Sequence, residues 1–94
     1  MYTRRSTFPL KPDSSDQAVE IAQKYGTVLH DLPGHVSTVM FLDGDSLTSI
    51  TTWDTEANAE AVKSTRDKAQ NDLGDLLSGA PSTTIAATAV HDVG

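Results

Sequence analysis

Residues 35–53, HVSTVMFLDGDSLTSITTW, limit the fold of this chain more than any other stretch. Residues 47–53 are predicted to form a strand that ends in Trp53. Residues 35–42 form a second strand with apolar side chains on both faces, so neither face is expected to meet bulk water. Asp43-Gly44 is a strong hairpin signal, and the two strands are therefore predicted to be antiparallel neighbours. One face of the strand formed by residues 35–42 is expected to carry His35, Ser37, Val39 and Phe41.

An amphipathic helix is predicted before the hairpin, because apolar side chains recur there at three- and four-residue spacing. Asp13 or Ser14 is the expected N-cap, and Ser14 and Gln17 match a capping box. The helix is expected to end near Asp31. Its apolar stripe contains Ala18, Ile21, Ala22, Tyr25, Val28, Leu29 and Leu32.

A second helix is predicted after the hairpin. Asp54 or Thr55 is the expected cap, and Gly79 and Pro81 are expected to end the helix. Its buried stripe is expected to contain Ala61, Val62, Ala69, Leu73, Leu76 and Leu77. A solvated outer face is expected to carry Lys63, Arg66 and Lys68.

Two further strands are predicted, at residues 2–8 and 83–93. The resulting β-α-β-β-α-β order is typical of an α+β, ferredoxin-like fold with a four-stranded antiparallel sheet. Two helices cover one face of such a sheet, so its other face needs a partner. A second copy of the chain would supply that cover by two-fold packing.

Length and charge narrow the class of protein and its partners. At 94 residues the chain is expected to form one domain, 1–94, with marginal stability of its own. It has no cysteine, so oligomerisation rather than disulfide bonding is the expected source of extra stability. A net charge of −6 without a basic patch argues against nucleic acid and membrane surfaces as partners. No secretory signal or membrane-spanning run is visible, and a cytoplasmic location is expected.

Three motifs resemble the antibiotic biosynthesis monooxygenase-like proteins of the dimeric α+β barrel superfamily. LPGHVS leads from a helix into a strand, LDGDS forms a hairpin turn, and TTWDTEANAEA joins a strand ending in Trp53 to an acidic helix. The resemblance implies a barrel-shaped homodimer. It also implies oxidation of flat polycyclic phenols with dioxygen, without a cofactor, in a pocket lined by Trp53. Haem-degrading members of the superfamily add an Asn on the first strand and a His on the second helix, and this chain has neither.

Trp53, Tyr25 and Asn58 are the candidate substrate-binding residues on or beside the helices. Trp53 could be a core plug, a clamp on a partner subunit or a pocket wall. Tyr25 lies in the apolar stripe of the first helix, as core packing or as a hydroxyl donor to a pocket. Asn58 lies one turn into the second helix and could face either the cavity or solvent.

Histidine and arginine supply the remaining candidates. His35 and His91 lie near the ends of two strands, and together they could act as a base or an oxyanion donor if those ends meet. Arg4 and Arg5 face opposite sides of the first strand, so one of them must face the interior or an interface. That arginine could bind an anion or form a salt bridge between subunits, and Arg5 is taken as the substrate-binding candidate. No spacing of metal ligands or cofactor motif is visible, so neither a metal nor a cofactor is predicted.

The sequence is compatible with three functions. The first is a cofactor-independent monooxygenase acting on a small aromatic or polycyclic substrate. The second is a module that binds a small hydrophobic ligand without chemistry. The third is a structural dimer whose interior is filled by side chains. Small residues on the last predicted strand favour free space, whereas the scarcity of aromatic residues argues against a pocket that stacks a polycyclic substrate.

Overall fold

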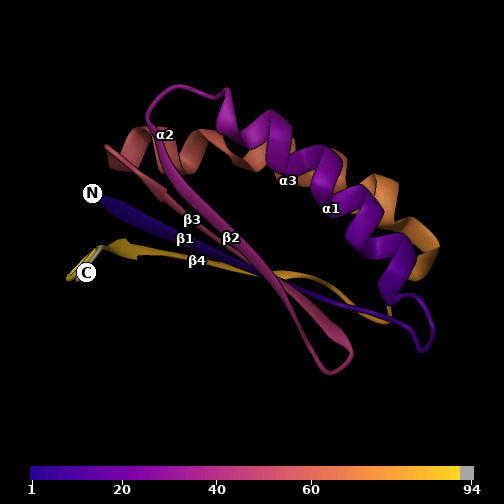
Figure 1. The fold of residues 1–94 in the computed structure, drawn as a ribbon. Helices are drawn as coiled ribbons and strands as arrows, with labels where there is room; N and C mark the ends of the chain where they lie inside the picture. The colour runs from indigo at the N-terminus through magenta and orange to yellow at the C-terminus, as the bar shows by residue number, and fades with distance from the viewer. Residues whose placement is uncertain (92–94) are drawn as a thin grey trace.

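Within residues 1–91, which the computed structural model describes, the helices cover one face of a four-stranded antiparallel sheet and leave the other uncovered (Figure 1). The elements are β1 (Tyr2–Pro9), α1 (Ser15–His30), β2 (His35–Asp43), β3 (Ser46–Trp53), α2 (Glu56–Ala61), α3 (Lys63–Leu73), the 3-10 helix η1 (Gly74–Leu76) and β4 (Ser82–Ala87). Hydrogen-bonded neighbours follow the order β2-β3-β1-β4. The predicted β-α-β-β-α-β fold is therefore confirmed. No helix of this part of the chain is long and apolar enough to cross a membrane.

The predicted hairpin forms, and its turn includes Gly44 at a positive φ of 59°. A β-bulge lies between His35 and Ser37, so that His35 pairs with Trp53 and Ser37 pairs with Thr52. Since cross-strand partners share a face, His35 lies on the helix-covered face and Ser37 on the uncovered face. The prediction that these two side chains share a face is wrong, because the extra residue of the bulge reverses the alternation.

The first helix begins and ends close to its predicted positions, but its capping box does not form. Ser14 is the N-cap with a right-handed helical backbone (φ −99°, ψ −1°), and its side chain makes no capping hydrogen bond. Reciprocal capping needs an N-cap residue in the extended region, which explains the difference. Val28, predicted in the apolar stripe, is 41% exposed.

The second helix is broken into α2 and α3 at Val62, and it ends earlier than predicted. Thr55 is its N-cap, as expected, and its hydroxyl accepts the Asn58 backbone N–H at 3.2 Å. α3 ends at Gly74, whose positive φ of 35° is incompatible with a continuing helix. Ala61, predicted in the buried stripe, is exposed, whereas Ala59 is buried and Val62 is buried as predicted.

The last strand is shorter than predicted. β4 ends at Ala87, whereas the prediction ran to Val93. Its final two predicted residues lie outside the described part of the chain.

The core consists of two apolar clusters between the sheet and the helices. The first contains Phe8, Leu10, Ala18, Ala22, Leu47 and Leu73. The second contains Leu29, Trp53, Ala59 and Val62. Met40 packs against both clusters.

Candidate functional site

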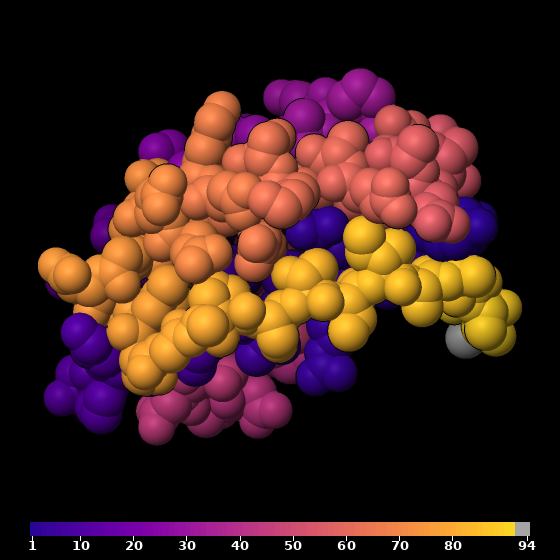
Figure 2. Space-filling model, turned by 180° about the vertical axis from the view of Figure 1, so that it is seen from behind, coloured from indigo at the N-terminus to yellow at the C-terminus, as the bar shows by residue number. Residues whose placement is uncertain are grey.

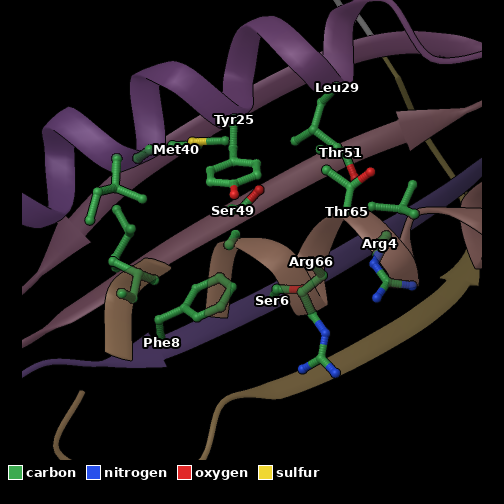
Figure 3. A pocket seen from close by; sticks show the side chains of 16 residues that line it. Arg4, Ser6, Phe8, Tyr25, Leu29, Met40, Ser49, Thr51, Thr65 and Arg66 are labelled. Atoms are coloured by element: carbon green, nitrogen blue, oxygen red, sulfur yellow. The ribbon is translucent and has the colours of Figure 1, made fainter. Parts of the chain in front are cut away.

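A cavity lies between the sheet and helices α1 and α3, bordered by residues of both core clusters (Figure 3). Its volume is about 50 Å³, counted as the space open to the centre of a water molecule. A single water needs about 10–15 Å³ by this measure, so the cavity holds a few waters or part of a compact ligand. The apolar lining is Phe8, Ile21, Ala22, Leu29, Met40, Leu47, Val62, Ala69 and Leu73. The polar lining is Arg4, Ser6, Tyr25, Ser49, Thr51, Thr65 and Arg66.

The alternation of β1 decides which arginine reaches this cavity. Arg4, Ser6 and Phe8 face the helices and are buried. Arg5 is exposed on the other face, where it borders a shallow depression with Thr7. The arginine in the cavity is therefore Arg4, and the candidate Arg5 does not reach it.

Arg4 is buried without a carboxylate partner among the described residues. Only 5% of its surface is exposed, and its Nη1 donates a 3.2 Å hydrogen bond to the backbone carbonyl of Ala59. Its Nε is buried and has no acceptor in the part of the chain described. Burial lowers the pKa of Arg4, the nearby Arg66 lowers it further, and Asp67 opposes the change.

Arg66 lies beside Arg4, and its Nε is likewise buried and has no acceptor within residues 1–91. Its Nη2 donates to Asp67 Oδ1 at 3.0 Å, and Lys63 Nζ donates to Oδ2 of the same carboxylate at 2.8 Å. The Lys63 hydrogen bond is the main cause that lowers the pKa of Asp67, and Arg66 adds to it.

The prediction that Arg66 belongs to a solvated face is wrong. Its side chain is only 19% exposed. Val62, Arg66, Ala69 and Leu73 are spaced by four, three and four residues, which places them on one helical face. This spacing indicates that Arg66 shares the buried face of the helix. The sequence prediction instead followed the charge of Arg66 and placed it in solvent.

Trp53 is not among the lining residues of the cavity. It packs with Leu29 and Val62, which do line the cavity. Its side chain is wholly buried, and its Nε1 donates a 2.8 Å hydrogen bond to Thr51 Oγ1. An indole N–H can only donate, so the hydroxyl proton of Thr51 stays available for another acceptor. Thr51 lines the cavity and pairs across the strands with Arg4. Trp53 thus plugs the core and also orients a hydroxyl of the site.

Tyr25 is the one sequence candidate that lines the cavity within the described residues. Its hydroxyl donates to Asp72 Oδ2 at 2.6 Å and joins α1 to α3. This hydrogen bond is the main cause that raises the pKa of Tyr25 and lowers the pKa of Asp72. Lys24, 3.3 Å from the same oxygen, lowers the pKa of Asp72 further.

The Tyr25–Asp72 contact predicts an acid-dependent loss of stability. The folded pKa of Asp72 lies below its ordinary value of 3.8, so the contact stabilises the fold above that value. This contribution is lost as the pH falls through the lowered pKa. Replacing Tyr25 with Phe removes the main cause, so the variant should lose less stability than the wild type between about pH 5 and pH 2. Urea unfolding across this range measures the difference. Tyr2→Phe is the control and should respond to acid as the wild type does.

His35 and His91 lie near one end of the sheet, but neither lines the cavity. His35 Nε2 lies 2.7 Å from Thr38 Oγ1, and its ring meets the edge of Trp53 at a centroid distance of 5.4 Å. Burial lowers the pKa of His35, and the neighbouring His30 lowers it further. His91 Nε2 lies 3.3 Å from Ser37 Oγ, on the uncovered face. The sheet therefore separates the two imidazoles.

Asn58 belongs to the start of α2 rather than to the cavity lining. Its Nδ2 donates to Asp54 Oδ1 at 2.8 Å. In residues 1–91, no group of three or more His, Asp or Glu side chains could hold a metal ion.

Comparisons with known proteins show which solved structures share this fold. No family model matches the sequence, and no curated protein matches it either. Among solved structures, a protein of unknown function from Nitrosomonas europaea has a TM-score of 0.86 at 11% identity, over 99% of this chain and 93% of that one. A structure described as an antibiotic biosynthesis monooxygenase has a TM-score of 0.80 at 10% identity, over 96% of this chain and all of that one.

A third structure, described as an anthrone oxidase-like protein, has a TM-score of 0.71 at 22% identity. It aligns with 89% of this chain, which spans 42% of its length. The chain therefore has the fold of the antibiotic biosynthesis monooxygenase-like proteins, as its motifs predicted.

Proposed function

We propose that this protein binds a small aromatic compound in the cavity between sheet and helices and oxidises it with dioxygen, as a cofactor-independent monooxygenase. The observation that carries the proposal is a largely apolar cavity with a few convergent polar side chains, in a fold shared with a structure described as an antibiotic biosynthesis monooxygenase. The volume favours a compact ring system over the polycyclic compounds that the resemblance implied.

The proposed reaction converts an activated ring CH₂ group, which a hydroxylated aromatic ring carries in its keto form, into a carbonyl. The substrate loses four electrons to dioxygen; one oxygen atom forms the new C=O group, and the other leaves as water with the two hydrogen atoms. All four electrons come from the substrate. The protein would contribute orientation and exclusion of water, both of which favour reaction at a fixed carbon.

A matched pair of cavity and surface variants tests the activity. Oxygen uptake is measured with one- to three-ring hydroxylated aromatic compounds, and ¹⁸O₂ is used to count labelled atoms in the product. One labelled atom per product is expected. Ala69→Phe should abolish uptake because it fills the cavity, whereas Ala61→Phe, on an exposed helix position, should leave it unchanged. Uptake no faster than without protein, or equal in both variants, would contradict the proposal.

A ligand-binding module without chemistry is the second candidate. It is favoured by the lining of the cavity, which includes no histidine among the described residues. His35 and His91 would have to act from outside that lining, and their catalytic role stays a prediction. Trp53 and Asn58 are proposed to support the site rather than to touch the ligand.

We also propose that two chains pair through the uncovered sheet faces, in the cytoplasm. Val39 and Phe41, on this face of β2, are 57% and 41% exposed. A second copy would bury them and satisfy the expectation that neither face of β2 meets bulk water.

Adding charge to the uncovered face should separate the pair. Phe41→Asp combined with Val39→Asp is expected to give a monomer at micromolar concentration, because burying two carboxylates is costly. Analytical ultracentrifugation measures the mass. Val28→Asp is the matched control, since Val28 is also 41% exposed but lies on α1, and it should leave a dimer. If the wild type is a monomer at this concentration, the proposed pairing of two chains is wrong.

A further inference from the structure

We infer that the ligand of the cavity carries a carboxylate, which is held by Arg4 and Arg66 with the Thr51 hydroxyl as a third donor. The inference rests on the proposed function only in using the same cavity, and it holds for a binder as well as for an enzyme. It names the chemical class of the ligand as a small aromatic monocarboxylate.

The balance of charge around the two arginines supports an anion. Two guanidinium groups lie close enough that Arg66 disfavours the cationic form of Arg4, and Asp67 is the one acid that acts on Arg4. Asp67 is also hydrogen-bonded to Lys63. Arg66 and the exposed Lys63 therefore share one carboxylate, whereas the buried Arg4 has none among the described residues, and a buried positive charge without a partner is costly. A bound carboxylate would supply this partner.

The unused donors point to the same place. Arg4 Nε and Arg66 Nε are both buried and without an acceptor among residues 1–91, although both residues line the cavity. Figure 3 shows the two guanidinium groups on the same side of the cavity, towards β4. Thr51 lies beside Arg4 on the neighbouring strand, and its hydroxyl oxygen accepts the Trp53 N–H, while its own proton has no acceptor within residues 1–91. Charged donors in a fixed arrangement are the usual partners of a carboxylate.

The rest of the cavity selects an apolar body for this ligand. Leu29, Met40 and Val62 border the space, and the ring of Tyr25 forms part of its wall (Figure 3). Viewed from behind, atoms of β1 are visible between α3 and β4, so neither of these two elements covers this edge of the layer (Figure 2). A flat ring would face the apolar wall while its carboxylate stays at the arginine side.

Benzoate and benzamide test the inference, because they share a ring and differ in charge. Binding is measured by titration calorimetry without oxygen, so that no turnover interferes. Benzoate should bind at least about tenfold more tightly than benzamide, which corresponds to the value of a charge-assisted hydrogen bond. Arg66→Gln should weaken benzoate about tenfold and leave benzamide unchanged, whereas Arg5→Gln, on the opposite face, should change neither.

Arg4→Gln should weaken benzoate at least as much, and a circular dichroism spectrum shows whether this variant folds. If it does not fold, Arg66→Gln decides the test, since the Arg66 side chain is partly exposed. Equal binding of benzoate and benzamide, no binding of benzoate at millimolar concentration, or equal losses in Arg66→Gln and Arg5→Gln would overturn the inference. The two orphan Nε atoms would then be satisfied by water.

The binding test of the carboxylate site and the uptake test of the oxygenase can fail independently of each other. Selective benzoate binding without oxygen uptake on any substrate would refute the oxygenase and leave the carboxylate site in place. Oxygen uptake on hydroxylated aromatic compounds, together with equal binding of benzoate and benzamide, would refute the carboxylate site and leave the oxygenase.

Discussion

Replacing Trp53 with alanine is expected to lower the free energy of unfolding by about 3–5 kcal/mol. The indole is wholly buried against Leu29, Ala59 and Val62, so its removal leaves a cavity in the second core cluster. Small domains have only about 5–15 kcal/mol in total, and the variant should be largely unfolded at moderate urea concentrations. Circular dichroism is the appropriate probe, because Trp53 is the only tryptophan and fluorescence would be lost with it.

Trp53→Phe separates packing from hydrogen bonding at the same position. The phenyl ring keeps most of the buried volume but cannot donate to Thr51 Oγ1. Its expected loss is smaller, about 1–2 kcal/mol. Equal losses in the alanine and phenylalanine variants would mean that the hydrogen bond, rather than the buried ring, accounts for the contribution of Trp53.

Replacing Gly34 with alanine is expected to cost about 1–3 kcal/mol, although Gly34 lies in a turn. Its φ is +77°, which disfavours any residue with a Cβ atom. An added Cβ would also collide with the side chains of Asp54 and Asn58, which are hydrogen-bonded to each other. Urea unfolding gives the loss.

Gly44→Ala is the matched control for Gly34→Ala. Gly44 also has a positive φ, of 59°, but a Cβ there would meet nothing within 4 Å. Its substitution should therefore cost only the backbone strain, about 1 kcal/mol. If the two variants lose the same stability, the contact of Gly34 with Asp54 and Asn58 does not restrict the position.

The fold could be predicted from the sequence because its signals are local. The Asp43-Gly44 turn and the spacing of apolar residues in α1 each depend on a few neighbouring residues. The errors in the predicted elements arose at positions where tertiary packing, rather than local sequence, determines the structure. The bulge after His35 depends on the register with β3, and the break at Val62 separates α2, which packs against the sheet, from α3, which packs against α1.

The site was predicted only in part, for the same physical reason. Alternation along β1 required that one of two adjacent arginines face inward, but it did not say which one. Arg66 was assigned to solvent because a charged residue usually is, and its burial follows from the partly apolar helix face that it shares with Val62 and Ala69. Trp53 was placed correctly at the strand end. Its hydrogen bond to Thr51, through which it supports the cavity, could be found only in three dimensions.

A crystal structure of the protein with benzoate tests the central claim, that the cavity between sheet and helices is the ligand site. We expect the benzoate ring beside Tyr25 and Leu29, with its carboxylate oxygens within hydrogen-bonding distance of Arg4 Nε and Arg66 Nε. Benzoate bound on the uncovered sheet face near Phe41, with only water in the cavity, would contradict it.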